Sequence, residues 1–455
     1  MKVMVVFPGS IVRGRYRPLI TILIVTINVL VYIYTTSRGT PLLVSSEEIF
    51  YKYGFIPHYL LTDLYEGVLR IFTSMFIHAD IVHIFFNMYF LWLFGSRLEG
   101  FIGHGKMLLL YLISGITATL FHVAFIPVGG YDALTIPAVG ASGAISGVLG
   151  AYLLALPHTK LYMCWFFMFI PLCFSLPAEA FMVIWFAQQV IYGYLRLGGV
   201  AYFAHIGGFV MGLVLGPLLT RHVARQGLTP EILRYIERVL GVIIPRPRGV
   251  STGVKVVLVL LLLAVAGGFL YASQATTRSQ IYTSSITATR VDREAPAQSD
   301  RVVFALTPSG LVTSTSRQEY VRILVNRLVG TPYVYNPGLA EREEYVEWRG
   351  YVTVSGVRVP VVLNMSARYD ELGVLVESRG VMGTVSVVIS QYGVSPGETM
   401  VLSFDISSSR VHRAGQVLSG VCLVAAGVSF LAVVSVTTSR GALLHPHEEL
   451  FAPYL

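Results

Sequence analysis

Long apolar runs are the feature that most limits what this chain can fold into. A helix needs about 20 mostly apolar residues to cross the roughly 30 Å hydrocarbon core of a bilayer. Only 13% of the residues are charged, whereas soluble domains carry about 25%. The sequence therefore predicts an α-helical protein that crosses the membrane several times. The expected spans are residues 18–36, 74–94, 106–126, 141–157, 178–195, 202–220, 254–273 and 415–436.

Basic residues predict the orientation of these spans. Arginines precede the first span, and a larger basic cluster follows the sixth. Cytoplasmic loops of membrane proteins carry an excess of lysine and arginine, and six crossings return the chain to the side on which it began. This distribution accounts for the formal net charge of +8, so no nucleic-acid partner is expected. The expected cytoplasmic segments are residues 1–17, 221–253 and 437–455.

The segment between the last two spans, residues 274–414, has a different character. Polar and apolar residues alternate along parts of it, which is typical of strands with one buried face, and Pro396-Gly397 is a turn signal. We expect an extracytoplasmic, β-rich, sandwich-like domain, with either a ligand-binding or recruiting role or a purely structural one. The alternating stretches are residues 351–365, 383–394 and 399–406.

Two polar residues begin spans that run in the same direction. Ser142 begins the fourth span and His205 the sixth, so both should lie near the outer face of the membrane. Polar side chains at membrane depth are costly and are functional candidates by default. Small residues three and four positions apart let transmembrane helices approach closely, which would bring the imidazole within reach of the hydroxyl as a general base. The glycines with this spacing are Gly143, Gly147, Gly150, Gly208 and Gly212.

The second span carries a further polar pair. His83 and Asn87 are four residues apart, so they share one helix face. Such a pair, with the backbone N–H of Ser142, can donate hydrogen bonds to the charge that develops on a carbonyl oxygen. Taken singly, each residue also fits a helix cap, a hydrogen-bonded histidine or simple packing. Four polar residues from three spans at one depth favour a Ser-His dyad with an oxyanion hole.

At these positions the chain resembles the rhomboid family of intramembrane serine proteases, over about residues 18–220. Gly140-Ala141-Ser142-Gly143 is similar to the family motif GxSG, which carries the nucleophile. Ala204-His205, with Gly208 and Gly212, is similar to AHxxGxxxG, which carries the base. His83 and Asn87 are similar to HxxxN, whose side chains help to form the oxyanion hole in that family. His78 and Gly95-Ser96-Arg97-Leu98-Glu99 also match.

Two positions depart from the family pattern. Leu69-Arg70 stands where a Trp-Arg pair is common in the first external loop. Ser146 stands where some members carry a tyrosine packed on the catalytic histidine, so the resemblance does not indicate what orients His205. It also says nothing about the last two spans or the domain between them.

The resemblance implies a six-helix core that hydrolyses peptide bonds in or near the transmembrane segments of single-span membrane proteins, without metal or cofactor. A helical substrate hides its carbonyls in backbone hydrogen bonds, so it must unwind before attack. Residues 161–177 are apolar but contain Pro171 and Pro177, which interrupt a helix. We expect this segment to be interfacial or loosely packed and, with the fifth span, to form a lateral gate.

Two other functional classes make different predictions. A rhomboid-like chaperone or client-binding protein, which holds membrane proteins without cutting them, would typically lack the serine or the histidine, and this chain keeps both. A transporter or channel would show ionisable residues in several spans or two matching halves, and the sequence shows neither. The serine protease is therefore the favoured interpretation, with an active site that opens to the extracytoplasmic side.

Overall fold

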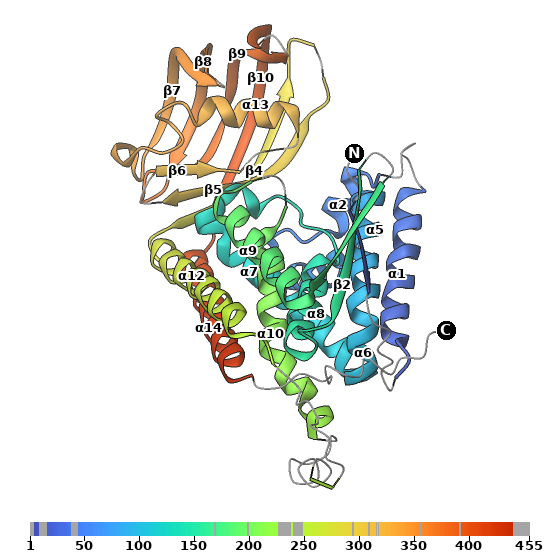
Figure 1. Cartoon of the computed structure of the whole chain (residues 1–455). Helices are drawn as coiled ribbons and strands as arrows, with labels where there is room; N and C mark the ends of the chain where they lie inside the picture. Colours follow the sequence, from blue (N-terminus) through green and yellow to red (C-terminus); the bar gives the residue numbers. More distant parts are fainter. Residues whose placement is uncertain are drawn as a thin grey trace. The chain divides into compact units, whose positions relative to one another are not determined.

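The chain forms two compact units in the structure, which is a computed structural model (Figure 1). The membrane unit comprises Met1–Gly129, Pro137–Gln274 and Leu418–Leu455, and the β-rich unit comprises Gly130–Ile136 and Ala275–Val417. Most of the predicted cytoplasmic linker and tail lie outside the described residues. The structure describes residues 4–8, 16–37, 44–167, 170–197, 200–225, 238–239, 249–293, 295–307, 310–314, 316, 318–354, 356–390 and 393–439.

Apolar helices build the membrane unit. Among the described residues, six helices are long and apolar enough to cross a membrane, so the chain is a multi-pass membrane protein. Two further helices, α8 with 14 residues and α9 with 17, are shorter, so the count of eight crossings stays a prediction. The helices are α1 (Leu19–Thr36), α5 (Ile81–Phe90) continued by η1 (Leu91–Gly95) and α6 (Ser96–Ile102), α7 (His104–Gly129), α8 (Ser142–Ala155), α9 (Ala178–Tyr194), α10 (Tyr202–Arg225), α12 (Thr252–Thr276) and α14 (Ala414–Thr438).

The second span differs from its predicted bounds of residues 74–94. Ser74 is the last residue of a separate helix, α4 (Leu64–Ser74). The spanning helix begins at Ile81, and Asp80 caps its start by accepting a hydrogen bond from the N–H of His83 (2.8 Å). The helix runs on to Ile102 and stops at Gly103, whose φ of 83° is left-handed. Apolar residues fill both the end of α4 and the loop after it, so hydropathy alone misplaced the boundary.

Glu99, at the end of this span, anchors the first helix. Its buried carboxylate accepts hydrogen bonds from the N–H groups of Ile20 and Thr21 (both 2.8 Å) and from the Thr21 hydroxyl (2.7 Å). N–H groups in the first turn of a helix have no partner within that helix. His104 Nδ1 lies 2.6 Å from the same carboxylate. Glu99 therefore joins the start of α1 to α6.

Residues 160–167 and 170–177 form two paired strands, so the expectation of an all-α core is wrong, while the expectation of an interfacial or loosely packed segment stays a prediction. β2 (Lys160–Phe167) pairs antiparallel with β3 (Ile170–Pro177), and β1 (Met4–Pro8), from the predicted N-terminal segment, pairs with the other edge of β2. Aromatic residues, which favour strands, are frequent here, and the two prolines disfavour a helix. Pairing of the strands gives the backbone N–H and C=O groups hydrogen-bond partners in a segment where the prolines would interrupt a helix.

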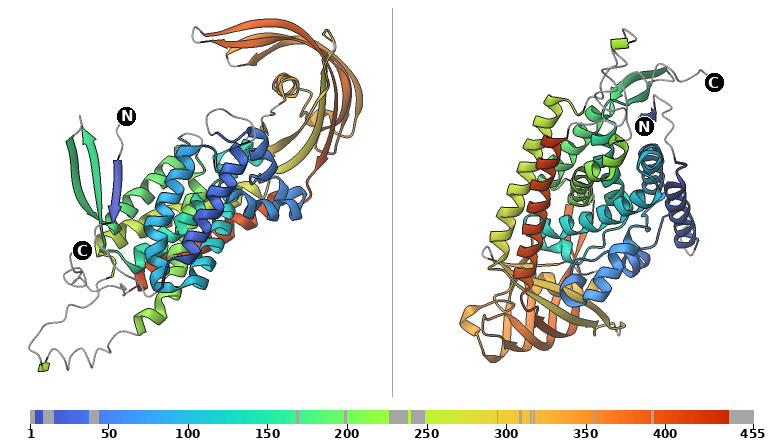
Figure 2. Two further views of the ribbon diagram at one scale, coloured as in Figure 1. Left: turned by 90° about the vertical axis from the view of Figure 1, so that its right-hand side faces the viewer. Right: turned by 90° about the horizontal axis from the view of Figure 1, so that it is seen from below.

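In the described part of the β-rich unit, an antiparallel sheet packs against a helix. The sheet has seven strands in the order β6-β5-β4-β10-β9-β8-β7, and it curls round α13 (Glu319–Leu328; Figure 2). The expected sandwich of two sheets is therefore wrong. The strands are β4 (Gln280–Arg290), β5 (Gln298–Thr307), β6 (Gly310–Thr313), β7 (Glu343–Val354), β8 (Val357–Tyr369), β9 (Leu375–Ser390) and β10 (Gly393–Arg410).

Helix α13 covers the buried face of this sheet. Its buried side chains recur at the spacing i, i+3, i+4 and i+7, which forms one apolar stripe along a helix. Alternation along the strands predicts correctly that one face is buried, but it does not indicate whether a sheet or a helix covers that face. The stripe consists of Val321, Leu324, Val325 and Leu328.

The strand boundaries also differ from the prediction. The alternating stretch at residues 351–365 covers the end of β7 and most of β8, with Gly356 between them in a left-handed conformation (φ 82°). Pro396-Gly397, predicted as a turn, lies inside β10, where the register with β9 shifts between Pro396 and Thr399. Such an irregularity tolerates a proline because the ladder is locally interrupted.

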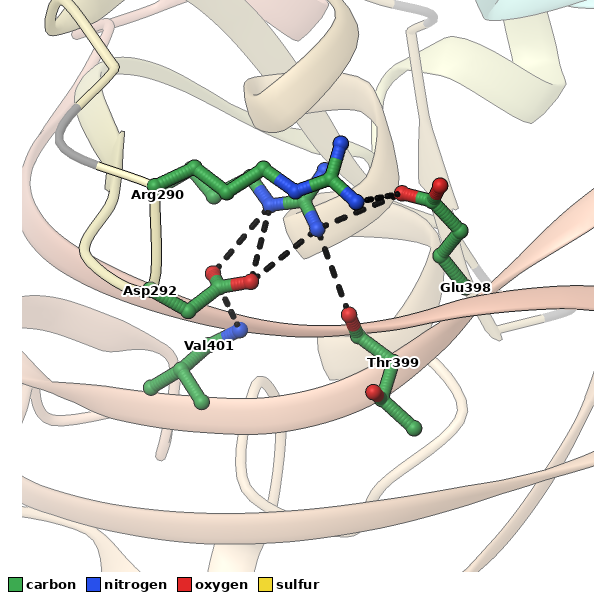
Figure 3. A network of polar contacts seen from close by, with 6 residues as sticks. Arg290, Asp292, Glu398, Thr399 and Val401 are labelled. Carbon is green, nitrogen blue, oxygen red and sulfur yellow. Dashed lines mark hydrogen bonds and ion pairs between the residues drawn. The ribbon is translucent and has the colours of Figure 1, made fainter.

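A network of charged groups closes the turn after β4 (Figure 3). The Arg290 guanidinium donates to both carboxylate oxygens of Asp292 (3.0–3.1 Å), and it also reaches Glu398 and the carbonyl of Thr399. Asp292 accepts a further hydrogen bond from the N–H of Val401 on β10 (3.1 Å). The hydrogen bonds from Arg290 lower the pKa of Asp292 to about 2.

The β-rich unit also includes a short segment from between α7 and α8, which the predicted domain at residues 274–414 did not contain. This segment carries the 3₁₀ turn η2 (Tyr131–Leu134). The Tyr131 hydroxyl donates to Ser279 Oγ (3.2 Å), and both residues are buried. The segment that leads toward Ser142 is therefore packed into the β-rich unit.

Candidate active site

The candidate site lies at the start of α8. Every residue of this helix from Gly143 to Ala155 is buried, and α8 contacts α5, α7, α9 and α10. A helix that is apolar on all sides is typical of the centre of a bundle. The first residue of α8, Ser142, is only half-buried, so it lies where the buried helix meets its entrance.

Glycines let α8 and α10 pack backbone against backbone. A Cβ atom on Gly208 would lie 1.8 Å from the carbonyl oxygen of Gly143, and one on Gly212 would lie 2.0 Å from that of Gly147. From the other helix, a Cβ on Gly150 would lie 2.2 Å from the carbonyl oxygen of Phe209. No side chain fits at these distances. The close approach expected of the fourth and sixth spans is therefore present.

This packing brings the two expected side chains together. Ser142 Oγ lies 2.8 Å from Nε2 of His205, a residue in the first turn of α10. If the hydroxyl donates to Nε2, the neutral ring carries its proton on Nδ1. An imidazole in that state can accept the serine proton when the oxygen attacks a carbonyl carbon.

The other ring nitrogen of His205 has a partner that sequence reasoning missed. Nδ1 lies 2.9 Å from Oε1 of Gln189, a buried residue of α9. Trp185, one turn earlier on α9, lies with its ring centroid 6.2 Å from that of His205. The sequence did contain a signal for this partner, because Gln189 lies within an apolar span and a polar amide at membrane depth is costly. Ser146 instead donates to the carbonyl of Ser142 (2.7 Å).

His83 faces the segment that precedes Ser142. Gly140 has a left-handed φ of 121°, and a Cβ there would lie 2.8 Å from His83 Nε2 and 3.7 Å from Ser142 Oγ. The N–H of Gly140 donates to the carbonyl of Ser74 (2.9 Å). The left-handed conformation therefore requires glycine at this position, and both His83 Nε2 and Ser142 Oγ lie close to it.

Asn87 lies one turn after His83 on α5 and is buried. Its side-chain amide donates to the carbonyl of His83 on its own helix (2.9 Å). The structure thus brings Ser142, His205 and His83 together but leaves the amide of Asn87 on α5. Hydrogen bonds used in catalysis are often long or poorly aligned in the free enzyme and tighten when the substrate binds.

The start of α8 favours negative charge. The first N–H groups of a helix lack partners within the helix and form the positive end of its dipole. The backbone N–H of Ser142 belongs to this end. Within the described part of the chain, no carboxylate forms an ion pair with His205, and no group of three or more His, Cys, Asp or Glu residues could hold a metal ion.

Arg70 supports the site from a distance. Leu69 is exposed, whereas Arg70 is buried and donates to the carbonyls of Tyr51 (2.5 Å) and Gly54 (3.1 Å). The next residue, Phe55, exchanges two backbone hydrogen bonds with Ala138 (2.8 and 2.9 Å). Arg70 therefore fixes the strand-like segment on which the chain before Ser142 rests.

Comparison with known proteins finds the same region. Residues 65–222 match the family model of the rhomboid domain. The chain is 32% identical to "Rhomboid protein 1, mitochondrial" of Saccharomyces cerevisiae over 179 residues. This match covers 38% of this chain and 48% of that protein. It is 39% identical over 95 residues to "Rhomboid protease GluP" of Bacillus subtilis, covering 21% of this chain and 17% of that protein.

A third relative is "Rhomboid-type serine protease 2" of Emericella nidulans. The two chains are 32% identical over 154 residues, which cover 33% of this chain and 27% of the relative. The matched stretches thus span less than half the length of each of these three relatives.

Proposed function

We propose that this chain, which belongs to the rhomboid family through its domain at residues 65–222, is an intramembrane serine endopeptidase. The contact of 2.8 Å between Ser142 Oγ and His205 Nε2 carries the proposal. Ser142 is the proposed nucleophile, and His205 is the proposed general base and acid. The proposed substrates are single-span membrane proteins, cut in or near their transmembrane segments.

In the first half of the proposed reaction, Ser142 Oγ attacks the carbonyl carbon of the scissile bond while its proton passes to His205 Nε2. The carbonyl oxygen becomes negatively charged, and the N–H of Ser142 with the side chains of His83 and Asn87 would donate hydrogen bonds to it. When the C–N bond breaks, His205 returns the proton to the leaving amine. The serine then carries an ester of the amino-terminal product.

In the second half, a water molecule attacks the ester carbonyl and gives its proton to His205. The C–O bond to Ser142 breaks, and His205 returns the proton to the serine oxygen. The carboxylic acid product leaves, and the dyad is restored. Neither half requires a metal or a cofactor.

The membrane setting supports a preference among substrates. Backbone carbonyls within a transmembrane helix are hydrogen-bonded, so a substrate must unwind before Ser142 can attack. Segments with Gly, Ser or Pro near the scissile bond should be favoured, and α9 is the proposed lateral gate. We also propose that the site opens to the extracytoplasmic side, with the β-rich unit on that side as a binding or recruiting domain and both termini in the cytoplasm.

Labelling with a fluorophosphonate probe tests the proposal on the full-length protein in detergent. The native protein should be labelled, and Ser142→Ala and His205→Ala should not. Ser146→Ala is a matched control, because its hydroxyl lies one turn away and is bonded to its own helix. Labelling that persists in Ser142→Ala would contradict the assignment. A folded native protein that is not labelled would favour a client-binding role without cleavage.

A further inference from the structure

Gln189 is an unusual residue for its position on α9. Only 5% of its surface is exposed, and the residues buried beside it are mostly apolar. Burying an amide without a hydrogen bond is costly, and within a membrane the cost is larger still. Glu179, the other strongly polar side chain buried on this helix, accepts a hydrogen bond from the N–H of Ser251 (2.9 Å). The corresponding partner of Gln189 is His205.

The direction of this hydrogen bond determines the protonation of the ring. An amide oxygen can only accept, so Nδ1 of His205 donates to Oε1 of Gln189 across 2.9 Å. A neutral imidazole has one N–H, which leaves Nε2 free to accept from Ser142. The opposite tautomer would present an N–H to the serine hydroxyl and could not take its proton.

We infer that Gln189 is the positioning residue of the dyad, which holds the His205 ring and selects the tautomer that can deprotonate Ser142. The inference rests on the proposed function and deepens it. Gln189 would act through His205 and would not touch the substrate. It would take the place of the ring-packing side chain that Ser146 cannot supply.

Neighbouring groups support the same role. Trp185 and Gln189 are four residues apart on α9, so they share one face, and the Trp185 ring is inclined by 34° to the imidazole. The groups in contact with His205 are the Ser142 hydroxyl from α8 and the side chains of Gln189 and Trp185 from α9. The titratable group of α5 on this side is His83, whose Nε2 lies against Gly140. A neutral amide thus stands where many serine hydrolases have a carboxylate.

Helix α9 is itself held in place. The Tyr194 hydroxyl, near its end, donates to the carbonyl of Ala264 on α12 (3.1 Å). A Cβ on Gly268 of α12 would lie 2.0 Å from that hydroxyl oxygen, so glycine makes room for it. A helix outside the matched rhomboid domain therefore contacts the end of the helix that carries Gln189.

The test measures the second-order rate constant of fluorophosphonate labelling across pH, using the full-length protein in detergent. Gln189→Leu keeps the size but loses the hydrogen bond, and we expect the rate constant to fall about tenfold, as for one net hydrogen bond of about 1.4 kcal/mol. The neighbouring Gln188 is exposed, so Gln188→Leu is the matched control and should label at the native rate.

Gln189→Glu separates a positioning role from a merely structural one. A carboxylate also accepts from Nδ1, so labelling should recover at high pH. Its negative charge stabilises the protonated ring, which cannot accept a proton, so the acidic limb of the pH–rate profile should move to higher pH. Leu at this position should leave the thermal midpoint close to native while the rate constant falls.

The outcomes distinguish this inference from the proposed function. Native labelling that requires Ser142, together with an unchanged rate constant in Gln189→Leu, overturns the inference and leaves the protease assignment standing. Failure of the folded native protein to label removes both. If Gln189→Leu does not fold, a Gln189→Glu protein with the native pH profile overturns the inference.

Discussion

Gly208 of α10 lies against the backbone of Gly143 on α8 so closely that a Cβ on Gly208 would be 1.8 Å from the Gly143 carbonyl oxygen. Ser142 precedes Gly143, and His205 lies one turn before Gly208. The side chains of Ser142 and His205 therefore begin next to a helix contact in which backbone meets backbone. The distance between hydroxyl and imidazole depends on glycines that take no part in the chemistry.

The first prediction concerns this contact. Gly208→Ala should push α8 and α10 apart, at a cost of about 1–3 kcal/mol for overpacking, and should abolish labelling of Ser142. Thermal unfolding in detergent and probe labelling measure the two effects. Gly267→Ala on α12 is the control, because a Cβ there meets no atom within 4 Å. A Gly208→Ala protein as stable and as reactive as the native one would show that the helices do not pack in this way.

The second prediction concerns the proposed oxyanion hole. His83→Ala and Asn87→Ala should each cost about 3–4 kcal/mol of transition-state stabilisation, a fall of about 10²–10³ in kcat with KM little changed. The measurement is cleavage of a tagged single-span substrate. Phe85→Ala, which removes an exposed side chain of the same helix, should retain activity. If Asn87→Ala retained the native rate while His83→Ala lost it, Asn87 would have no part in the oxyanion hole. Its amide would then serve only to hydrogen-bond the His83 carbonyl within α5.

The third prediction concerns Glu99. Glu99→Gln should lower the thermal midpoint of the membrane unit, because one amide oxygen cannot replace the two charged oxygens that accept hydrogen bonds from α1. Hydrogen bonds to a charged group contribute about 1.5–3 kcal/mol each, so we expect a loss of about 2–3 kcal/mol. Glu48→Gln, at an exposed position of α2 (Glu47–Tyr53), should leave the midpoint unchanged. An equal effect of both variants would argue against the role of Glu99.

The fourth prediction concerns acid. The pKa of Asp292 falls from an ordinary 3.8 to about 2 in the folded protein, so its contribution to stability is present above pH 4 and is lost as the pH falls toward 2. Hydrogen exchange of the Val401 amide, which donates to this carboxylate, should lose its protection over that window after correction for the intrinsic rate. Asp292→Asn should remove the step, and Asp132→Asn, at an exposed position, should keep it. A step that survives in Asp292→Asn would assign it to another group.

Local patterns in the sequence predicted much of the architecture. Hydropathy found a helix within each expected span, and alternation found parts of β7 to β10 but none of β4, β5 and β6. Ser142, His205, His83 and the glycines of α8 and α10 were candidates from spacing alone, since offsets of three and four define one face of a helix. The start of the second span was predicted seven residues too early, at residue 74 and not at Ile81, because hydropathy identifies apolar residues and does not identify where a helix begins.

Contacts between distant segments were beyond such patterns. Nothing local indicates that α13 rather than a second sheet covers the strands, or that β1 pairs with β2. Gln189 and His205 lie 16 residues apart on different helices, so their hydrogen bond depends on how α9 packs against α10. The sequence by itself determined that the chain crosses the membrane several times and made Ser142 and His205 the candidates for a dyad, because hydropathy and helical periodicity are properties of neighbouring residues. Only the tertiary structure decided which side chain holds His205, because that depends on the packing of whole helices.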